Sequence, residues 1–207
     1  MPEPTRENVH NRMKELGHVV FDENTCDMNV VGLRRVGGRT DHYDDLMTLS
    51  WKVTDTDLDN RPEEERWEYH RWPCTTDPGG KYLVKPLGSL GTAVLRPGQY
   101  RGSHKLGTFA PTKTWAHEAL IQCGTLKLWH DGNKDNVVDY GQAETTSTPA
   151  SGICIHRPLG DFSAGCQVFQ SRVHFEQFIQ LCKLQVIAGL GGTFTYTLLD
   201  WEFPDGT

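Results

Sequence analysis

The spacing of apolar residues changes along the chain and predicts different elements in its two parts. Near the N-terminus, Val9, Met13 and Leu16 recur every three or four positions, as on one face of a helix. Thr5 stands where an N-cap is favoured, and a glycine follows the last apolar position. The pattern therefore predicts an amphipathic helix over residues 5–16.

The next part of the chain is weakly periodic. Residues 28–35 and 51–57 are apolar runs typical of short strands. Two acidic runs and a turn-forming cluster follow between residues 54 and 80, and we interpret most of this stretch as loop. Residues 1–78 are therefore expected to form an N-terminal helix and loop extension that packs on the core.

From residue 81 the pattern becomes β-like, with short apolar or alternating runs separated by Gly and Pro. Residues 171–184 instead have a helical period with Ser171 as candidate cap, and residues 193–203 alternate strongly as a final strand. The face expected to be buried on that helix consists of Phe175, Phe178, Ile179 and Cys182. These patterns predict a mainly β (α+β) fold with few helices, whose core is residues 79–207.

Composition and charge exclude several classes of partner. The 207 residues suffice for one sizeable domain, and a formal charge of −6 argues against a nucleic acid held by a general basic field. The first 18 residues contain no apolar segment of the length that a secretory signal needs, and no apolar run could span a bilayer. We therefore expect synthesis in a cytoplasm, no membrane span and free thiols rather than disulfides.

One stretch, ICIHRPLGDFSAGCQV at residues 153–168, combines several features of thiol chemistry. A cysteine acts as a nucleophile when a base lies within hydrogen-bond reach, the thiol is partly exposed and N–H donors await the oxyanion. His156 ends an alternating run, so its ring is held on a rigid strand, on the same face as Cys154. Gly165 permits a sharp turn before Cys166. We expect iodoacetamide to label Cys166 near neutral pH, ahead of the other five cysteines.

The Ser163-Ala164-Gly165-Cys166 sequence, preceded by an isoleucine-histidine strand end, resembles the motif of the L,D-transpeptidase catalytic domain family. The resemblance covers about residues 80–200. It implies a β-rich sandwich or barrel with a few short helices, and a peptidoglycan stem peptide as substrate.

The resemblance also implies a role for each residue of the motif. Cys166 would be the thiolate nucleophile and His156 its base. The backbone N–H groups of Gly165 and Cys166 would form much of the oxyanion hole. In the family a backbone carbonyl orients the imidazole and the residue after the base lies beside it; Arg157 takes that place here.

The sequence departs from the family pattern in the motif itself. Ala164 stands where the family usually has a second histidine, and Phe169 lies near a position that is commonly polar. The loop between base and nucleophile is also shorter than usual. We expect Ser163, Ala164 and His117 to contact the substrate, with His117 either taking over from the missing histidine or serving as a surface or structural residue.

Two metal sites are alternatives to this interpretation. Cys154, His156 and Cys166 supply three candidate zinc ligands, with a fourth from elsewhere in the chain. Residues 131–142 alternate like a calcium loop through the side chains Asp131, Asn133, Asp135 and Asp139. Yet Asn136 and Gln142 stand where such a loop has Gly and Glu, so the segment is better interpreted as a solvated turn.

The favoured hypothesis is a cysteine-dependent enzyme that acts on peptidoglycan by acyl transfer through a thioester, as a hydrolase or transpeptidase, with no cofactor and no metal. Residues 75–86, 91–107 and 119–136 also resemble a group of phage and bacterial proteins. Together with the lack of a signal, this favours a wall hydrolase delivered from the cytoplasm, such as a phage endolysin. A non-catalytic binding or structural protein on the same fold, or a zinc site, remain the alternatives.

Overall fold

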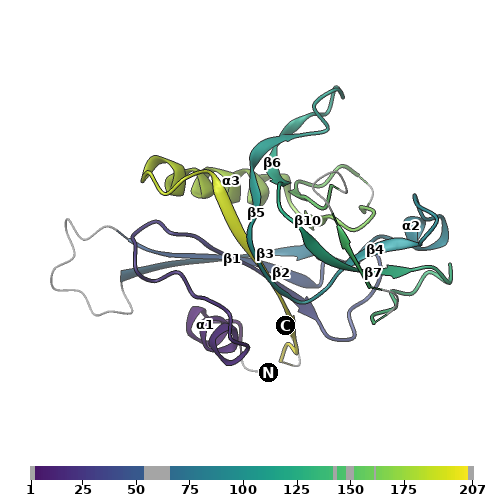
Figure 1. The fold of residues 1–207 in the computed structure, drawn as a ribbon, viewed down its shortest axis with the longest axis horizontal. Coiled ribbons are helices and arrows are strands. Elements are labelled where there is room, and N and C mark those ends of the chain that lie inside the picture. Colours follow the sequence, from purple (N-terminus) through teal and green to yellow (C-terminus); the bar gives the residue numbers. More distant parts are fainter. Residues whose placement is uncertain (1–2, 54–65, 142–143, 148–151, 161, 205–207) are drawn as a thin grey trace.

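The computed structural model describes residues 3–53, 66–141, 144–147, 152–160 and 162–204, and the fold of this part is mainly β (Figure 1). Eight strands form a closed barrel in the order β1-β11-β5-β6-β9-β10-β3-β2. Their bounds are β1 (Asn29–Arg35), β2 (Asp45–Lys52), β3 (Trp67–Thr75), β5 (Gly98–Phe109), β6 (His117–Gln122), β9 (Ile155–His156), β10 (Gln167–Phe169) and β11 (Thr193–Trp201). A three-stranded sheet contains β4 (Thr92–Leu95), β7 (Leu126–Asp131) and β8 (Glu144–Ser147). The predicted mainly β fold is confirmed.

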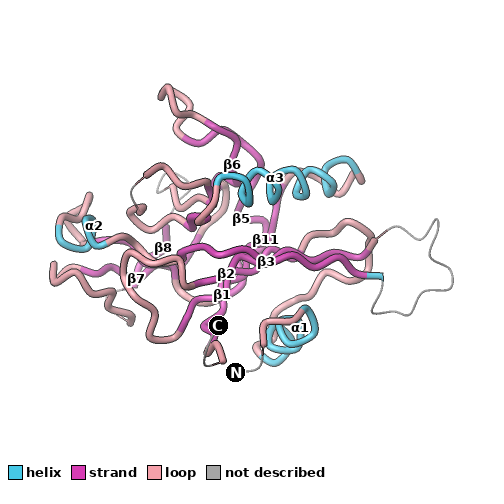
Figure 2. The backbone as a smooth tube through the Cα atoms, turned by 180° about the vertical axis from the view of Figure 1, so that it is seen from behind, coloured by secondary structure: helices cyan, strands magenta, loops and turns pink. Residues whose placement is uncertain are grey.

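Three helices accompany the strands in the described part of the chain: α1 (Arg6–Glu15), α2 (Gly80–Val84) and α3 (Arg172–Ile187). Figure 2 shows α1 and α3 on opposite sides of the central strands. Both predicted caps are present, since Thr5 accepts a hydrogen bond from the N–H of Asn8 and Ser171 from that of His174. The predicted apolar face of α3 is buried. No helix in these residues combines the length and apolar character that crossing a membrane requires.

The prediction that residues 1–78 form a helix and loop extension is wrong. This part supplies β1, β2 and β3, and β1 pairs with the last strand β11 in parallel and with β2 antiparallel. Six of the seven residues of β1 are buried, so neither face of the strand is exposed to solvent. The strand predicted at residues 28–35 is confirmed as β1, but burial on both faces leaves no alternation that would mark it as part of the core.

Two predictions of strands, at residues 51–57 and at the run that begins at residue 81, also need correction. The strand expected at residues 51–57 ends at Lys52, and residues 54–57 lie outside the described part. The run that begins at residue 81 is the short helix α2 rather than a strand. Short apolar runs suit either element, and periodicity over five residues does not separate them.

A charged group lies in the barrel interior, close to the strands that carry the motif. Arg34 is 2% exposed, and its guanidinium pairs with Asp77 at 3.0 Å and donates to the carbonyl oxygens of Thr76 and Leu95. A buried charge persists only when it is paired and hydrogen-bonded. Burial, and then the charge of Asp77, raise the pKa of the neighbouring Asp45 to about 7. This network fixes the segment after β3.

Gln167 connects that network to the turn before Cys166. Its side chain is fully buried, accepts a hydrogen bond from the Tyr196 hydroxyl at 2.9 Å and donates to the Gly165 carbonyl at 3.2 Å. Gly32 makes room for Tyr196, because a Cβ there would lie 2.0 Å from the hydroxyl oxygen. The side chain of Gln167 thus connects the barrel interior to the turn before Cys166.

We expect Gln167→Leu to lower the free energy of unfolding by about 2 kcal/mol, because it leaves the buried Tyr196 hydroxyl without an acceptor. Urea denaturation measures the effect. Tyr196→Phe removes the orphaned hydroxyl, so the double variant should lose less stability than the sum of the two single variants. Additive losses would show that the two side chains do not depend on each other.

Candidate active site

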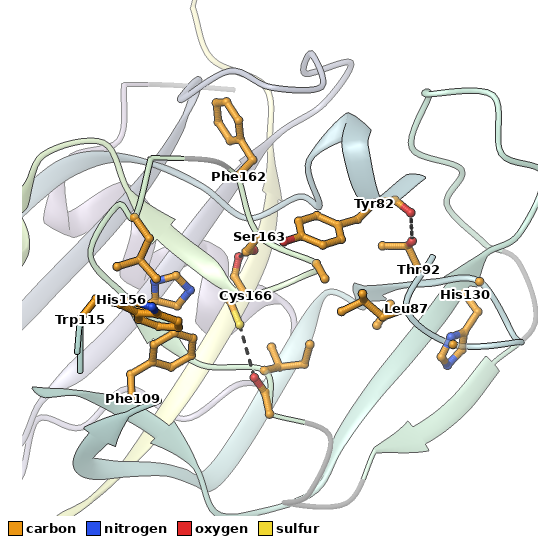
Figure 3. Close-up of a pocket in the computed structure, with 17 residues that line it drawn as sticks. Tyr82, Leu87, Thr92, Phe109, Trp115, His130, His156, Phe162, Ser163 and Cys166 are labelled. Carbon is orange, nitrogen blue, oxygen red and sulfur yellow. Dashed lines mark hydrogen bonds between the residues drawn. The ribbon is translucent and has the colours of Figure 1, made fainter. Parts of the chain in front are cut away.

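The register of β9 and β10 brings the base and the thiol to one cavity. These neighbouring strands run parallel with Val168 opposite His156, and Cys166 directly precedes β10. Both His156 and Cys166 line a cavity of about 740 Å³ (Figure 3). Its other lining residues come from α2, β4, β5, β7 and the loops: Tyr82, Leu87, Gly88, Gly91, Thr92, Ala93, Phe109, Trp115, His130, Gly152, Ile153, Leu159, Phe162, Ser163 and Ala164.

His156 is held as a neutral base. Its ring is buried and stacks on Phe109 with 4.3 Å between ring centroids. Its Nδ1 lies 2.7 Å from the carbonyl oxygen of Arg157, and because a carbonyl only accepts, we assign the proton to Nδ1. Burial lowers the pKa of His156 to about 4, against the opposing effect of the Arg157 carbonyl. At neutral pH the Nε2 lone pair can therefore accept a proton.

Cys166 is a protonated thiol in this arrangement. Its Sγ donates to the carbonyl oxygen of Gly152 at 3.3 Å and accepts from the N–H of Cys154 at 3.4 Å. Contact with the Cys154 thiol and burial raise the pKa of Cys166 well above its ordinary value. The raised pKa argues against the expected reactivity of Cys166 near neutral pH in the resting protein, and alkylation tests this expectation.

The described atoms contain no hydrogen bond between the Cys166 thiol and the His156 ring, although both side chains point into the cavity (Figure 3). The base and the thiol therefore line the same cavity without a hydrogen bond between them. Such contacts often form only when substrate binds.

The turn before Cys166 depends on Gly165 and Ser163. Gly165 has φ +120°, and a Cβ on it would lie 2.5 Å from the Ala93 carbonyl oxygen. The Ser163 hydroxyl donates to the Cys166 carbonyl at 2.8 Å and accepts from the Gly165 N–H at 3.3 Å. Because the Gly165 N–H is engaged, the predicted two-donor oxyanion hole is not preformed, and the Cys166 N–H is left as candidate donor.

His117 does not replace the missing motif histidine. It lies behind His156, with 6.1 Å between ring centroids, and lines a separate hollow of about 200 Å³ together with Arg157. The guanidinium of Arg157 donates to the Trp115 carbonyl, so only the Arg157 backbone serves the site. Ala164 does line the main cavity, as expected.

The expected alternation around Cys154 is also wrong. Because β9 spans only two residues, the pleat does not extend back to Cys154, and Ile153 shares the cavity with His156 instead. No group of three or more His, Cys, Asp or Glu within the described ranges is placed to hold a metal ion. The Cys154, His156 and Cys166 trio therefore lacks the arrangement that a zinc site needs.

The segment after β7 is the hydrogen-bonded turn that we favoured over a calcium loop. The Asn133 amide donates to the carboxylates of Asp135 and Asp139, at 2.9 and 2.6 Å. The N–H of Asp139 donates to Asp131 at 2.8 Å. These bonds engage one oxygen of each of the three carboxylates within the turn, and Gln142 lies outside the described residues.

Sequence reasoning missed three residues that shape the site. Gln167 could have been noticed as a polar residue beside the apolar pair of β10. No local sequence pattern marks Phe109 or Trp115 as site residues. The pairing of β5 with β6 brings them to His156, and this pairing cannot be predicted from the spacing of residues along the chain.

Comparisons with models of protein families, with curated proteins and with solved structures find no match. The resemblance to the L,D-transpeptidases stays a prediction that residues 153–168 carry. The function is therefore argued from the geometry around Cys166.

The neutral thiol of Cys166 in the resting protein predicts how its alkylation rate depends on pH. We expect the rate of Cys166 alkylation by iodoacetamide to keep rising with pH above about 9, because only the thiolate reacts. Peptide mapping after timed exposure at each pH measures it. Cys154→Ala removes one cause of the raised pKa and should move the curve to lower pH. A rate that levels off below pH 7 would indicate a preformed thiolate and contradict this prediction.

Proposed function

We propose that this protein is an acyl-transfer enzyme in which Cys166 attacks a carbonyl and His156 removes the thiol proton. The observation that supports it most is that a half-buried thiol and a neutral imidazole, fixed through its Nδ1, open onto the same cavity. His156 ends β9 and Cys166 adjoins β10, so neighbouring strands hold both groups.

The first half-reaction forms a thioester. When a carbonyl group enters, the thiol leaves Gly152 and turns to Nε2 of His156. The proton moves to Nε2 as Sγ bonds to the carbonyl carbon, and the Cys166 N–H donates to the oxyanion. Collapse of the tetrahedral intermediate breaks the carbon–nitrogen bond, and the imidazolium gives its proton to the leaving amine.

The second half-reaction releases the acyl group. Water or an amine attacks the thioester while His156 takes the proton of the attacking group, and the thiol is regenerated. The low pKa of His156 makes its imidazolium a strong acid, which favours rapid proton donation to both leaving groups. The protein thus uses a neutral pair that ionises only during attack.

The motif resemblance supports a stem peptide of peptidoglycan as the substrate of this reaction, with a wall hydrolase delivered from the cytoplasm as the biological setting. Ala164 leaves the cavity without the histidine that the family usually has there. Without that histidine, this chain can differ from the family in how often water, rather than an amine, accepts the acyl group.

The test is digestion of purified peptidoglycan, followed by muropeptide chromatography and intact mass of the protein. Cys166→Ala should give the profile of untreated peptidoglycan and no acyl adduct. Cys123→Ala is the matched control, because the Cys123 thiol also donates to a backbone carbonyl, at 3.4 Å, and does not line the cavity. Identical profiles for wild type and Cys166→Ala would reject the peptidoglycan substrate and favour a binding protein on this fold.

A further inference from the structure

The wall of the cavity beside Cys166 is largely apolar and aromatic. Besides Tyr82 and two alanines, the apolar and aromatic side chains that line it are Leu87, Phe109, Trp115, Ile153, Leu159 and Phe162. They come from separate parts of the chain, and Figure 3 shows Phe109 and Trp115 beside His156, with Leu87 on the opposite side of Cys166. A cavity of about 740 Å³ with such walls has the size and character of sites that bury organic groups larger than one methyl or amide.

Polar side chains on the wall are mostly engaged with the protein. The Thr92 hydroxyl donates to the Tyr82 carbonyl, and the Ser163 hydroxyl bridges Cys166 and Gly165. Nε2 of His130 lies 2.7 Å from the Thr145 hydroxyl. The two hydroxyls therefore have little donor capacity left for a strongly solvated ligand, and Nδ1 of His130 is buried without a partner among the described residues.

Charged side chains lie outside the cavity. Among the described lining residues none is Asp, Glu, Lys or Arg. Arg157, next to the base in sequence, donates to the Trp115 carbonyl and lines the smaller hollow behind His156. A carboxylate that enters the cavity would lose its hydration and find no cation to pair with, which costs free energy. An apolar group that leaves water for the cavity is stabilised by the hydrophobic effect.

We propose that the group held in this cavity during acyl transfer is an uncharged apolar or aromatic part of the substrate, and that substrate carboxylates stay outside. This inference rests on the proposed function, because the attack by Cys166 places the acyl donor here. It narrows the substrate class to acyl donors whose reacting residue is neutral. A stem peptide meets this condition only where the portion beside Cys166 bears no free carboxylate.

The experiment compares the p-nitrophenyl esters of N-acetyl-phenylalanine, N-acetyl-glutamine and N-acetyl-glutamate as acyl donors for the full chain. Glutamine and glutamate have nearly the same shape and differ in charge. We expect the phenylalanine ester to acylate Cys166 fastest and the glutamate ester at least about tenfold more slowly than the glutamine ester. Release of p-nitrophenolate gives the rate, and peptide mapping locates the adduct.

A matched pair of variants tests whether the wall sets the preference. Leu87 lines the cavity and Ile187, at the end of α3, does not, yet both side chains are 80% exposed and tolerate a charge. Leu87→Arg should narrow the difference between the glutamate and glutamine esters at least about threefold, because it supplies a cation. Ile187→Arg should leave it unchanged.

The outcomes separate the two proposals. Acylation of Cys166 by the glutamate ester at a rate equal to or above the glutamine ester would overturn the neutral-substrate inference and leave the acyl-transfer proposal standing. Absence of any Cys166 adduct with all three esters would overturn the acyl-transfer proposal, and this inference with it. An unchanged preference in Leu87→Arg would also count against the wall as its source.

Discussion

His156→Gln should lower kcat/KM for acyl transfer by about 10²–10⁴-fold, the range in which a positioned base contributes to catalysis. Glutamine has a comparable size and keeps an amide that can donate to the Arg157 carbonyl, but it cannot take the thiol proton. The rate is measured with the fastest acyl donor, and circular dichroism checks that the barrel is retained.

His117→Gln is the matched control for this variant. His117 also places Nδ1 near a backbone carbonyl, that of Trp115 at 3.1 Å, and contacts the edge of His156, but it does not line the main cavity. We expect its kcat/KM to stay within about threefold of wild type. Equal losses in the two variants would show that His156 acts through packing and not as a base.

The pH profile gives a second readout of the same role. The base is competent when neutral, and burial lowers the pKa of His156 to about 4. Protonation therefore removes activity only as the pH falls through about 4, and kcat/KM should be nearly constant from pH 7 down to 5. Half-loss of kcat/KM near pH 6.5 would show a base whose pKa is not lowered.

The sequence predicted the parts of the site that depend on neighbours in the chain. The helical period over residues 171–184 and the alternation over residues 193–203 correspond to α3 and β11. One face of α3 is buried and the other is partly solvated, whereas β11 keeps its alternating pattern although both of its faces are largely buried. The pairing of His156 with Cys166 was likewise predicted, because Cys166 follows the strand-end histidine by only ten positions.

The parts that were missed depend on contacts across the barrel. The strand at residues 28–35 was predicted, but its place in the barrel was not, because β1 is buried on both faces and its apolar run does not show which strands pair with it. The Cys166 thiol lies against Cys154, and this contact, with burial, gives it a raised pKa where the motif suggested a lowered one. No local pattern encodes either effect.

Gly165 links the fold to the chemistry, and Gly165→Ala should abolish detectable acylation of Cys166 and lower the free energy of unfolding by about 3 kcal/mol. A Cβ at this position would lie 2.5 Å from the Ala93 carbonyl oxygen in β4, on a backbone with φ +120°. Because backbone cannot yield as a flexible side chain does, the turn must shift and carry the Cys166 thiol away from His156. Urea denaturation and ester acylation measure the two losses.

Gly160→Ala separates backbone strain from the collision. Gly160 has a similar φ of +100°, but a Cβ there would meet no atom within 4 Å. Its substitution should therefore cost only the conformational strain, about 1 kcal/mol, and preserve acylation of Cys166. Gly165→Ala must lose more than Gly160→Ala in both measurements if close packing against β4 positions the nucleophile. Equal losses would mean that the turn needs only glycine's backbone freedom, and that the three-stranded sheet does not position Cys166.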